Sequence, residues 1–187
     1  MIRVLLFSVI LFTIKGSTPK RGEILDSFNG VHVFYNGSDF RKTTGRNITE
    51  TGYNLGLKFQ CVEYVKRYYY EVFNHEMPDS YGHAKDFFDK NLNDVELNED
   101  RGLMQFRNIR NEKPKVHDII IYDGMKENPF GHMGIISEVT TDSIEFIQQN
   151  FGTKTRQKLK LVEFKGIYTV ADYNVLGWLR IPESNEE

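Results

Sequence analysis

The stretch Gly56-Leu57-Lys58-Phe59-Gln60-Cys61-Val62-Glu63-Tyr64 joins a polar loop to an amphipathic segment and holds the single cysteine of the 187-residue chain. From Cys61 to about Phe73 apolar side chains recur at helical spacing, which predicts a helix that begins at the cysteine. A helix start presents unpaired N–H groups and the positive end of the peptide dipoles, and both favour a thiolate over a thiol. The cysteine therefore occupies a position suited to a nucleophile.

The predicted helix has an apolar face and a charged face. We expect Glu63, Lys66, Arg67 and Glu71 to lie outside the buried stripe, with Lys66 and Arg67 in solvent. A second short helix is expected over residues 84–88. The buried stripe is predicted to consist of Cys61, Tyr64, Val65, Tyr68, Tyr69, Val72 and Phe73.

Beyond Pro114 the pattern changes to strands. Short apolar runs follow one another, each bounded by turn residues. They are His117–Asp123, His132–Val139, Ser143–Gln149 and Val175–Ile181, and an earlier extended segment covers Gly30–Tyr35. Helices followed by adjacent strands with short connections predict an α+β fold, with N-terminal helices packed on an antiparallel sheet.

The amino terminus has the shape of a secretory signal. Arg3 precedes an apolar run from Val4 to Ile14, which is too short to span a bilayer, since that takes about 20 residues. We predict a signal peptide over residues 1–17, a linker over 18–29, one domain over 30–183 and a polar tail over 184–187. The small-residue cleavage pattern is incomplete, so an uncleaved anchor is the alternative. Export predicts a secreted or periplasmic protein without stable membrane insertion once the signal is removed.

Three separated segments supply the groups that a cysteine hydrolase needs. Cys61 would be the nucleophile, and His132, which opens a strand, would be the general base. Side chains alternate along a strand, so Gln148 and Asn150 share one face and either could orient His132. The Cys61 backbone N–H and a donor near Gln60 are candidates for binding the oxyanion. Cysteine on a helix, then histidine and an amide on later strands, is the order found in papain-like cysteine hydrolases.

Other interpretations of these residues compete with this one. Cys61 could be a small buried hydrophobic residue, and His117, which also opens a strand, is a rival base. The spacing of His, Cys and carboxylates predicts no metal site, and without a glycine-rich phosphate loop we expect no cofactor. The net charge of −2 gives no basic field that would attract nucleic acid. We expect a monomer whose partner is a peptide or amide substrate.

The residues from about Gly30 to Ile181 resemble the CHAP domain, the family of cysteine- and histidine-dependent amidohydrolases and peptidases. Within that family the chain is most similar to the amidase half of glutathionylspermidine synthetase/amidase. The matching blocks are Gly30-Val31, Lys58 to Tyr64, Ile120 to Asp123, Gly131-His132, Gln149-Asn150 and Leu176 to Trp178. The resemblance implies a papain-like fold of the NlpC/P60 type, with Cys61 as nucleophile and His132 as general base.

Two residues depart from the family pattern. Gln148 stands where the amidase relatives place a catalytic Glu, and His117 stands where relatives usually have glycine. A neutral amide stabilises an imidazolium less than a carboxylate does, so we expect a weaker preference for the thiolate–imidazolium pair.

The leading functional hypothesis is an exported cysteine amidase that cleaves a peptide-type amide through an acyl-enzyme. Its substrate would be a peptidoglycan peptide, which fits export, or a glutathionylspermidine-like amide, which fits the sequence likeness. The rival hypothesis is a catalytically weak binding module on the same fold, and it is motivated by Gln148.

Overall fold

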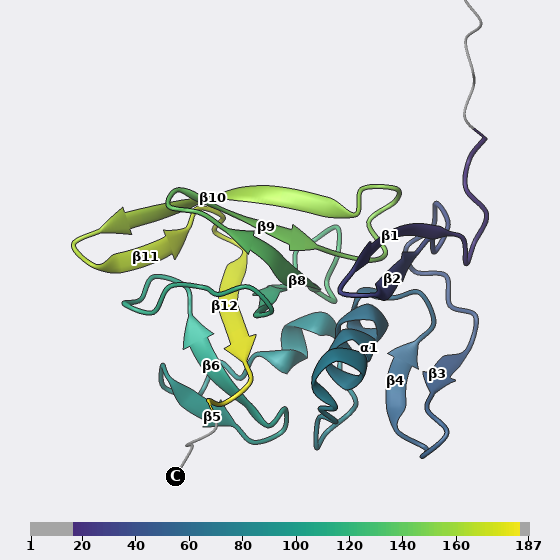
Figure 1. The fold of residues 1–187 in the computed structure, drawn as a ribbon, viewed down its shortest axis with the longest axis horizontal. Coiled ribbons are helices and arrows are strands. Elements are labelled where there is room, and N and C mark those ends of the chain that lie inside the picture. The colour runs from purple at the N-terminus through teal and green to yellow at the C-terminus, as the bar shows by residue number, and fades with distance from the viewer. Residues whose placement is uncertain (1–16, 184–187) are drawn as a thin grey trace, which may run out of the picture.

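The helix that the apolar spacing predicts is present in the computed structural model, which describes residues 17–183. It is α1, Cys61–Phe73, and it packs against strands of a large antiparallel sheet (Figure 1). The helix ends at Asn74, which adopts a left-handed conformation (φ 50°) and bonds back to the last turn. The signal-peptide interpretation falls on residues 1–17, of which 1–16 lie outside the described part, as does the polar tail 184–187.

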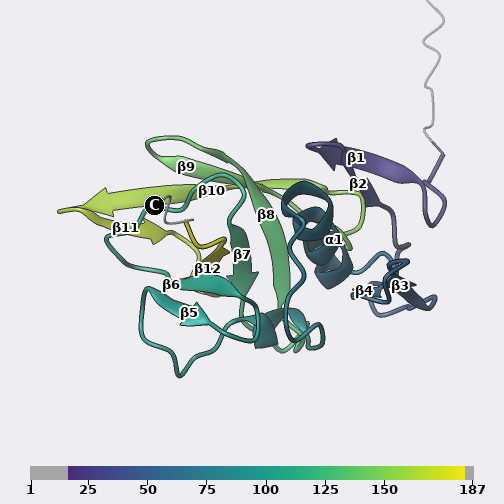
Figure 2. The same ribbon diagram turned by 60° about the horizontal axis from the view of Figure 1, so that its bottom comes forward.

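The main sheet has eight strands in the order β11-β10-β9-β8-β7-β12-β6-β5, and all neighbouring strands are antiparallel. Figure 2 shows α1 alongside β8 of this sheet. The strands are β5 (Glu96–Asn98), β6 (Leu103–Arg107), β7 (Ile119–Tyr122), β8 (His132–Val139), β9 (Ser143–Ile147), β10 (Arg156–Phe164), β11 (Ile167–Val170) and β12 (Val175–Arg180).

Two small hairpins complete the fold. They are β1 (Ile24–Phe28) with β2 (Val31–Phe34), and β3 (Arg46–Ile48) with β4 (Asn54–Leu57). The first hairpin begins inside the segment that the sequence assigns to a linker. No helix in residues 17–183 has both the length and the apolar character needed to cross a membrane.

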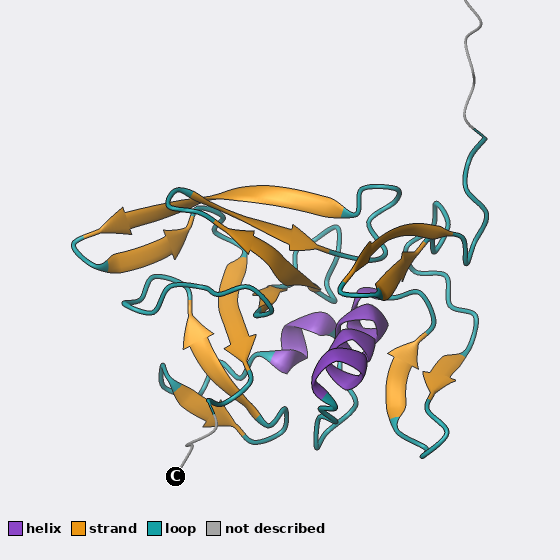
Figure 3. Cartoon of the chain, viewed as in Figure 1, coloured by secondary structure: helices purple, strands orange, loops and turns teal. Residues whose placement is uncertain are grey.

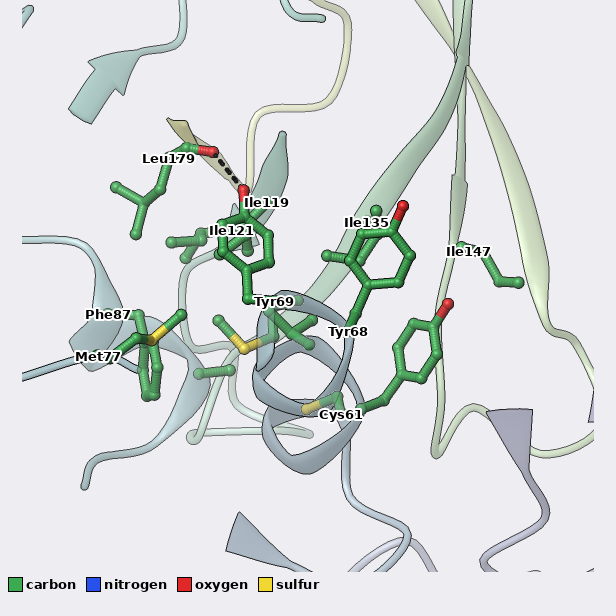
Figure 4. Close-up of a cluster of buried hydrophobic side chains, with 14 of the residues drawn as sticks. Cys61, Tyr68, Tyr69, Met77, Phe87, Ile119, Ile121, Ile135, Ile147 and Leu179 are labelled. Carbon is green, nitrogen blue, oxygen red and sulfur yellow. Dashed lines mark hydrogen bonds between the residues drawn. The ribbon is translucent and has the colours of Figure 1, made fainter. Parts of the chain in front are cut away.

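The central strands of the sheet are buried on both faces, and their side chains alternate between two apolar clusters. Ile119, Ile121 and Ile135 face α1, in the cluster that Figure 4 shows around Cys61, Tyr68 and Tyr69. The opposite face carries a second cluster built from Phe106, Ile120, Ile136, Ile144, Phe146, Leu161, Val170, Val175 and Trp178. The helix that carries the cysteine is therefore fixed against the strand that begins with His132.

The expectation of several N-terminal helices is wrong for the described residues. Between residues 17 and 183, α1 is the only α-helix, and the other purple segment in Figure 3 is the 3₁₀ turn described next. The segment predicted over 84–88 is a single turn of 3₁₀ helix, η1 (Ala84–Phe87), closed by a bond from the His83 N–H to Asp86 Oδ2 at 2.9 Å. The segment stops after one turn because the next residue, Phe88, has an extended backbone (φ −107°, ψ 114°).

The charged face of α1 is also not where the helical pattern puts it. Glu63, Lys66 and Arg67 are 2%, 0% and 7% exposed, because β4 and the β1–β2 hairpin cover that side of the helix. Glu63 and Arg67 form an ion pair of 2.7 Å, and Lys66 donates to the carbonyls of Asn54 and Ser80. Internal polar partners thus replace the solvent that the amphipathic pattern predicts.

Candidate active site

Cys61 is the first residue of α1, and Gln60 precedes it in an extended conformation without a side-chain cap. The cysteine is 8% exposed and belongs to the helix-side core. Burial raises the pKa of its thiol to about 11, while the backbone N–H groups of Met133, Val62 and Cys61 itself act in the opposite direction. The contact with Met133 places the sulfur beside the start of β8.

His132 begins β8 and lies opposite Tyr122 of β7. The residue before it, Gly131, allows the two strands to come close at this point. Its φ is +73°, and a Cβ there would lie 2.5 Å from the Tyr122 carbonyl oxygen. The imidazole lies between two aromatic rings, with centroids 6.4 Å away for Tyr122 and 5.7 Å away for Phe151. Desolvation in this setting lowers the pKa of His132 to about 4, so the ring is neutral at neutral pH.

Gln148 is the amide that contacts the histidine. Its Oε1 lies 2.8 Å from His132 Nε2, and its Nε2 donates to the Lys154 carbonyl at 3.3 Å. The second bond fixes which end of the amide faces the ring, so His132 must donate from Nε2. The other ring nitrogen, Nδ1, is therefore the unprotonated one and can accept a proton. Gln148 itself is 1% exposed.

Asn150 also borders this site but bonds to other residues, although the alternation along a strand allows it to face His132. Strand β9 ends at Ile147, and Asn150 has a left-handed backbone (φ 67°) that turns its side chain away. Its Nδ2 donates to Gln60 Oε1 at 2.5 Å and to the Phe40 carbonyl at 2.9 Å. In this structure, therefore, Asn150 contacts Gln60 and the loop that covers it.

The side chain of Gln60 is also committed to that loop. Its Nε2 donates to the carbonyls of Phe40, at 3.0 Å, and Lys42, at 3.4 Å. The amide is thus occupied in this structure, which leaves the Cys61 backbone N–H as the remaining candidate donor on this side of the site.

Cys61, His132, Gln148, Asn150 and Gln60 all line one cleft of about 1010 Å³. The walls come from six chain segments, 38–46, 56–62, 81–86, 122–132, 148–157 and 172–174, of which the second includes the first turn of α1. The exposed rings of Tyr81, Phe130 and Phe151 stand on these walls and are 60%, 41% and 50% exposed. A largely pre-formed cleft of this size is suited to a small molecule or a short peptide.

His117, the rival base, does not line this cleft. Its backbone has φ +78°, and its Nδ1 lies 2.7 Å from the Tyr68 hydroxyl, with Phe28 stacked at 5.8 Å. It borders a separate small cavity of about 170 Å³. Burial lowers the pKa of His117, but the geometry gives it no access to Cys61.

The sequence reasoning missed three parts of the site. Phe151 and the loop carrying Phe40 had no recognised pattern, because loop residues that line a cleft follow no periodicity. Glu63 and Gln149 belong to a buried hydrogen-bonded network beside the cysteine. Their nearness to Cys61 and Gln148 in the sequence was the available signal. Within residues 17–183, no three His, Cys, Asp or Glu side chains gather as metal ligands would.

The arrangement can carry out nucleophilic chemistry on a carbonyl group. It combines a thiol at a helix N-terminus, an imidazole whose free nitrogen can accept a proton, and a fixed amide on the other nitrogen. Because burial shifts both pKa values toward the neutral forms, the resting pair is thiol and imidazole, and proton transfer accompanies attack.

Comparison with known proteins gives a consistent result. The family model of the CHAP domain matches residues 50–150. Trypanothione synthetase of Crithidia fasciculata is 31% identical over 139 residues, covering 68% of this chain and 21% of the relative. Glutathionylspermidine synthase of the same organism is 30% identical over 101 residues, covering 52% and 14%. The matches thus span about a fifth or less of these curated relatives.

Among solved structures, Ly7917 with the hydrolyzing product of MDP has 21% sequence identity and a TM-score of 0.28, over 38% of this chain and 30% of that one. At that TM-score the likeness carries no weight for the fold.

Proposed function

This chain belongs to the CHAP domain family, and from that premise we propose that it is a cysteine amidohydrolase that cleaves a peptide-type amide. Membership in a family of amide hydrolases supports the reaction class. The observation that carries the proposal further is the tautomer set by Gln148, because it leaves His132 Nδ1 ready to accept the thiol proton.

The proposed reaction has two halves. His132 Nδ1 takes the Cys61 proton as the sulfur attacks the carbonyl carbon, and the carbonyl electron pair moves to oxygen. The Cys61 backbone N–H stabilises that oxyanion. Collapse of the adduct breaks the C–N bond, and the departing amine takes the proton from the imidazolium. Water then attacks the thioester, with His132 accepting its proton and returning it to the sulfur.

Two substrate classes fit this site. A peptidoglycan peptide agrees with export, which rests on the run from Val4 to Ile14 outside the described residues. A glutathionylspermidine-like amide agrees with the names of the relatives. The cleft carries Arg41 and Arg46 on one wall and Asp86, Glu127 and Asp172 on others, so charges of both signs border the space for a substrate.

The test is hydrolysis of glutathionylspermidine and of a muramyl stem peptide by the protein that lacks residues 1–17. Wild type should release a free amine from one of them, and Cys61→Ser should lose that activity while keeping its melting temperature. Thioester trapping by mass spectrometry would identify the acyl-enzyme. Release of product by Cys61→Ser at the wild-type rate would refute the nucleophile.

A binding module on the same fold is the second candidate, and one observation favours it. The neutral Gln148 and the burial of Cys61 and His132 leave the resting pair uncharged. In that case calorimetry would detect binding of one of the two compounds, and no turnover would follow.

A further inference from the structure

Gln149 lies between the two amides already described and points the other way. It is 1% exposed. Its Nε2 donates to the Gln60 carbonyl at 3.0 Å and to Glu63 Oε2 at 2.8 Å, and its Oε1 accepts the Phe34 N–H at 2.7 Å. Every polar atom of this side chain therefore has a partner, and two of its three partners belong to the start of α1.

Glu63 completes the contact from the helix side. Its Oε1 accepts bonds from Asn47 Nδ2 at 2.8 Å and from Arg67 Nε at 2.7 Å. Arg67 in turn donates to the His32 carbonyl at 2.8 Å. The buried carboxylate thus has a paired charge and fully used oxygens, the condition under which burial of an ion is tolerated.

The Gln60 carbonyl connects this network to the nucleophile. It accepts the Tyr64 N–H at 3.2 Å in the first turn of α1, as well as the amide of Gln149. Gln60 is bonded directly to Cys61 along the chain. Consecutive residues at the end of β9 therefore hold both reacting groups: Gln148 holds the imidazole, and Gln149 holds the turn that carries the sulfur.

We propose that Gln149 and Glu63 are positioning residues, which hold the first turn of α1 so that Cys61 stays in register with His132. Neither side chain lines the cleft, so both act through Gln60 and the helix. The catalytic consequence rests on the proposed function, whereas the placement of the sulfur does not.

The test compares Gln149→Met with Gln105→Met. Methionine matches glutamine in length but cannot make these hydrogen bonds. Gln105 is a matched control: it is 0% exposed, bonds to the backbone of Asp89 in both directions, and lies outside the cleft lining. Melting temperatures are recorded for each variant, together with the rate of Cys61 alkylation by iodoacetamide from pH 5 to 11.

We expect both variants to lose melting temperature, but only Gln149→Met to change the alkylation profile. Release of the helix start exposes the thiol, so alkylation at pH 8 should rise by about threefold or more and the profile should move to lower pH. Hydrolysis of whichever probe wild type cleaves should fall by about tenfold or more, because misplacement of a reacting atom is costly.

Simple destabilisation would also expose the buried thiol and lower hydrolysis, so the comparison with Gln105→Met decides. A change in both readouts that is confined to Gln149→Met, at a similar loss of melting temperature, assigns the effect to the start of α1. An alkylation profile of Gln149→Met that superimposes on wild type would overturn the positioning role. If Gln149→Met fails to fold, Glu63→Gln gives the same comparison, because its new amide N–H₂ would face the Gln149 donor. If wild type cleaves neither probe, the proposed function fails while the alkylation profile still decides the positioning role.

Discussion

At Gln148 a neutral amide occupies the place from which a carboxylate would hold the histidine. The amide fixes the tautomer through its two hydrogen bonds, but it adds no charge to stabilise an imidazolium. Burial keeps the resting pair neutral, and the hydrogen bond with Gln148 raises the pKa of His132 only in part against that effect. A charged side chain at position 148 would oppose the burial more strongly.

Gln148→Glu should raise the pKa of His132 by about one to three units and increase the thiolate fraction of Cys61 near neutral pH. A carboxylate 2.8 Å from Nε2 would stabilise the imidazolium directly. The change would be measured as faster iodoacetamide alkylation at pH 6 to 7. Gln157→Glu is the control, since Gln157 also lines the cleft and gains the same charge without a bond to His132. Equal acceleration of alkylation in both variants would mean that the added negative charge in the cleft causes the effect, not the bond to His132.

The acid limb of the pH–rate profile should lie unusually low. His132 must be neutral to accept the thiol proton, and desolvation lowers its pKa to about 4. The rate should therefore stay level as pH falls through 6 and should decline only near pH 4. The measurement is kcat/KM against pH on the cleaved probe. A limb near 6.5 would mean that the imidazole is hydrated in the working enzyme.

At the scale of the elements, α1 and β8 are where the sequence predicted the structure best. Seven apolar positions at helical spacing set the helix to Cys61–Phe73, and the run from His132 to Val139 matches β8. Strands β10 and β11 were missed, although Lys158-Leu159-Lys160-Leu161 alternates charged and apolar residues as a strand does. The alternation is short, and of Arg156–Phe164 only Leu161 is fully buried, so the segment resembles a surface loop.

Strand periodicity reduced the candidates for the amide that contacts His132 to two residues, but it could not choose between them. Cys61 and His132 follow from residue type and order, but Gln148 and Asn150 have the same parity on a strand. What separates them is where β9 stops and the positive φ at Asn150, and both depend on contacts with Gln60 and Phe40 far away in the sequence. Tertiary contacts also bury the charged face of α1, which helical amphipathicity places in solvent.

Lys66 on α1 gives a prediction about stability. Burial lowers its pKa from 10.5 to about 7, and its partners are carbonyls and the Tyr53 ring, 4.8 Å from the nitrogen. Between pH 7 and 10.5 the unfolded chain binds more protons than the folded one, so the free energy of unfolding should rise with pH over that window. Lys66→Met should remove this rise, while exposed Lys58→Met should preserve it. Urea unfolding at pH 7 and 9 measures the difference.

Across the whole molecule, the β1–β2 hairpin ties the amino-terminal segment to the sheet. Asp26 pairs with Arg156 at 2.9 Å and accepts from Thr155 at 2.8 Å, and Phe28 stacks on Tyr68 at 5.6 Å. These contacts connect the first described strand to β10 and to α1. We therefore expect the unit that folds to begin before residue 30.

A chain that begins at residue 30 should be less stable than one that begins at residue 18. It loses the β1 pairing, the Asp26–Arg156 ion pair and the Phe28 contact, of which the last alone is worth about 1 kcal/mol because the ring is only partly buried. Thermal unfolding of the two chains gives the comparison. Identical melting temperatures would mean that residues 18–29 form a linker, as the sequence predicts.

The use of Asn36 and Asn47 as internal donors has a consequence for producing the protein. Both stand in Asn-x-Ser/Thr sequons, Asn36-Gly37-Ser38 and Asn47-Ile48-Thr49. The Nδ2 of Asn36 donates to Asn150 Oδ1, and that of Asn47 donates to Glu63 Oε1. An N-linked glycan attaches at that same nitrogen. A sugar on Asn36, which is 1% exposed, cannot coexist with the folded site. Protein that is glycosylated at Asn36 in a eukaryotic secretory pathway before it folds could not form the hydrogen bonds beside the cleft. Protein expressed in a bacterial host without this modification would form them.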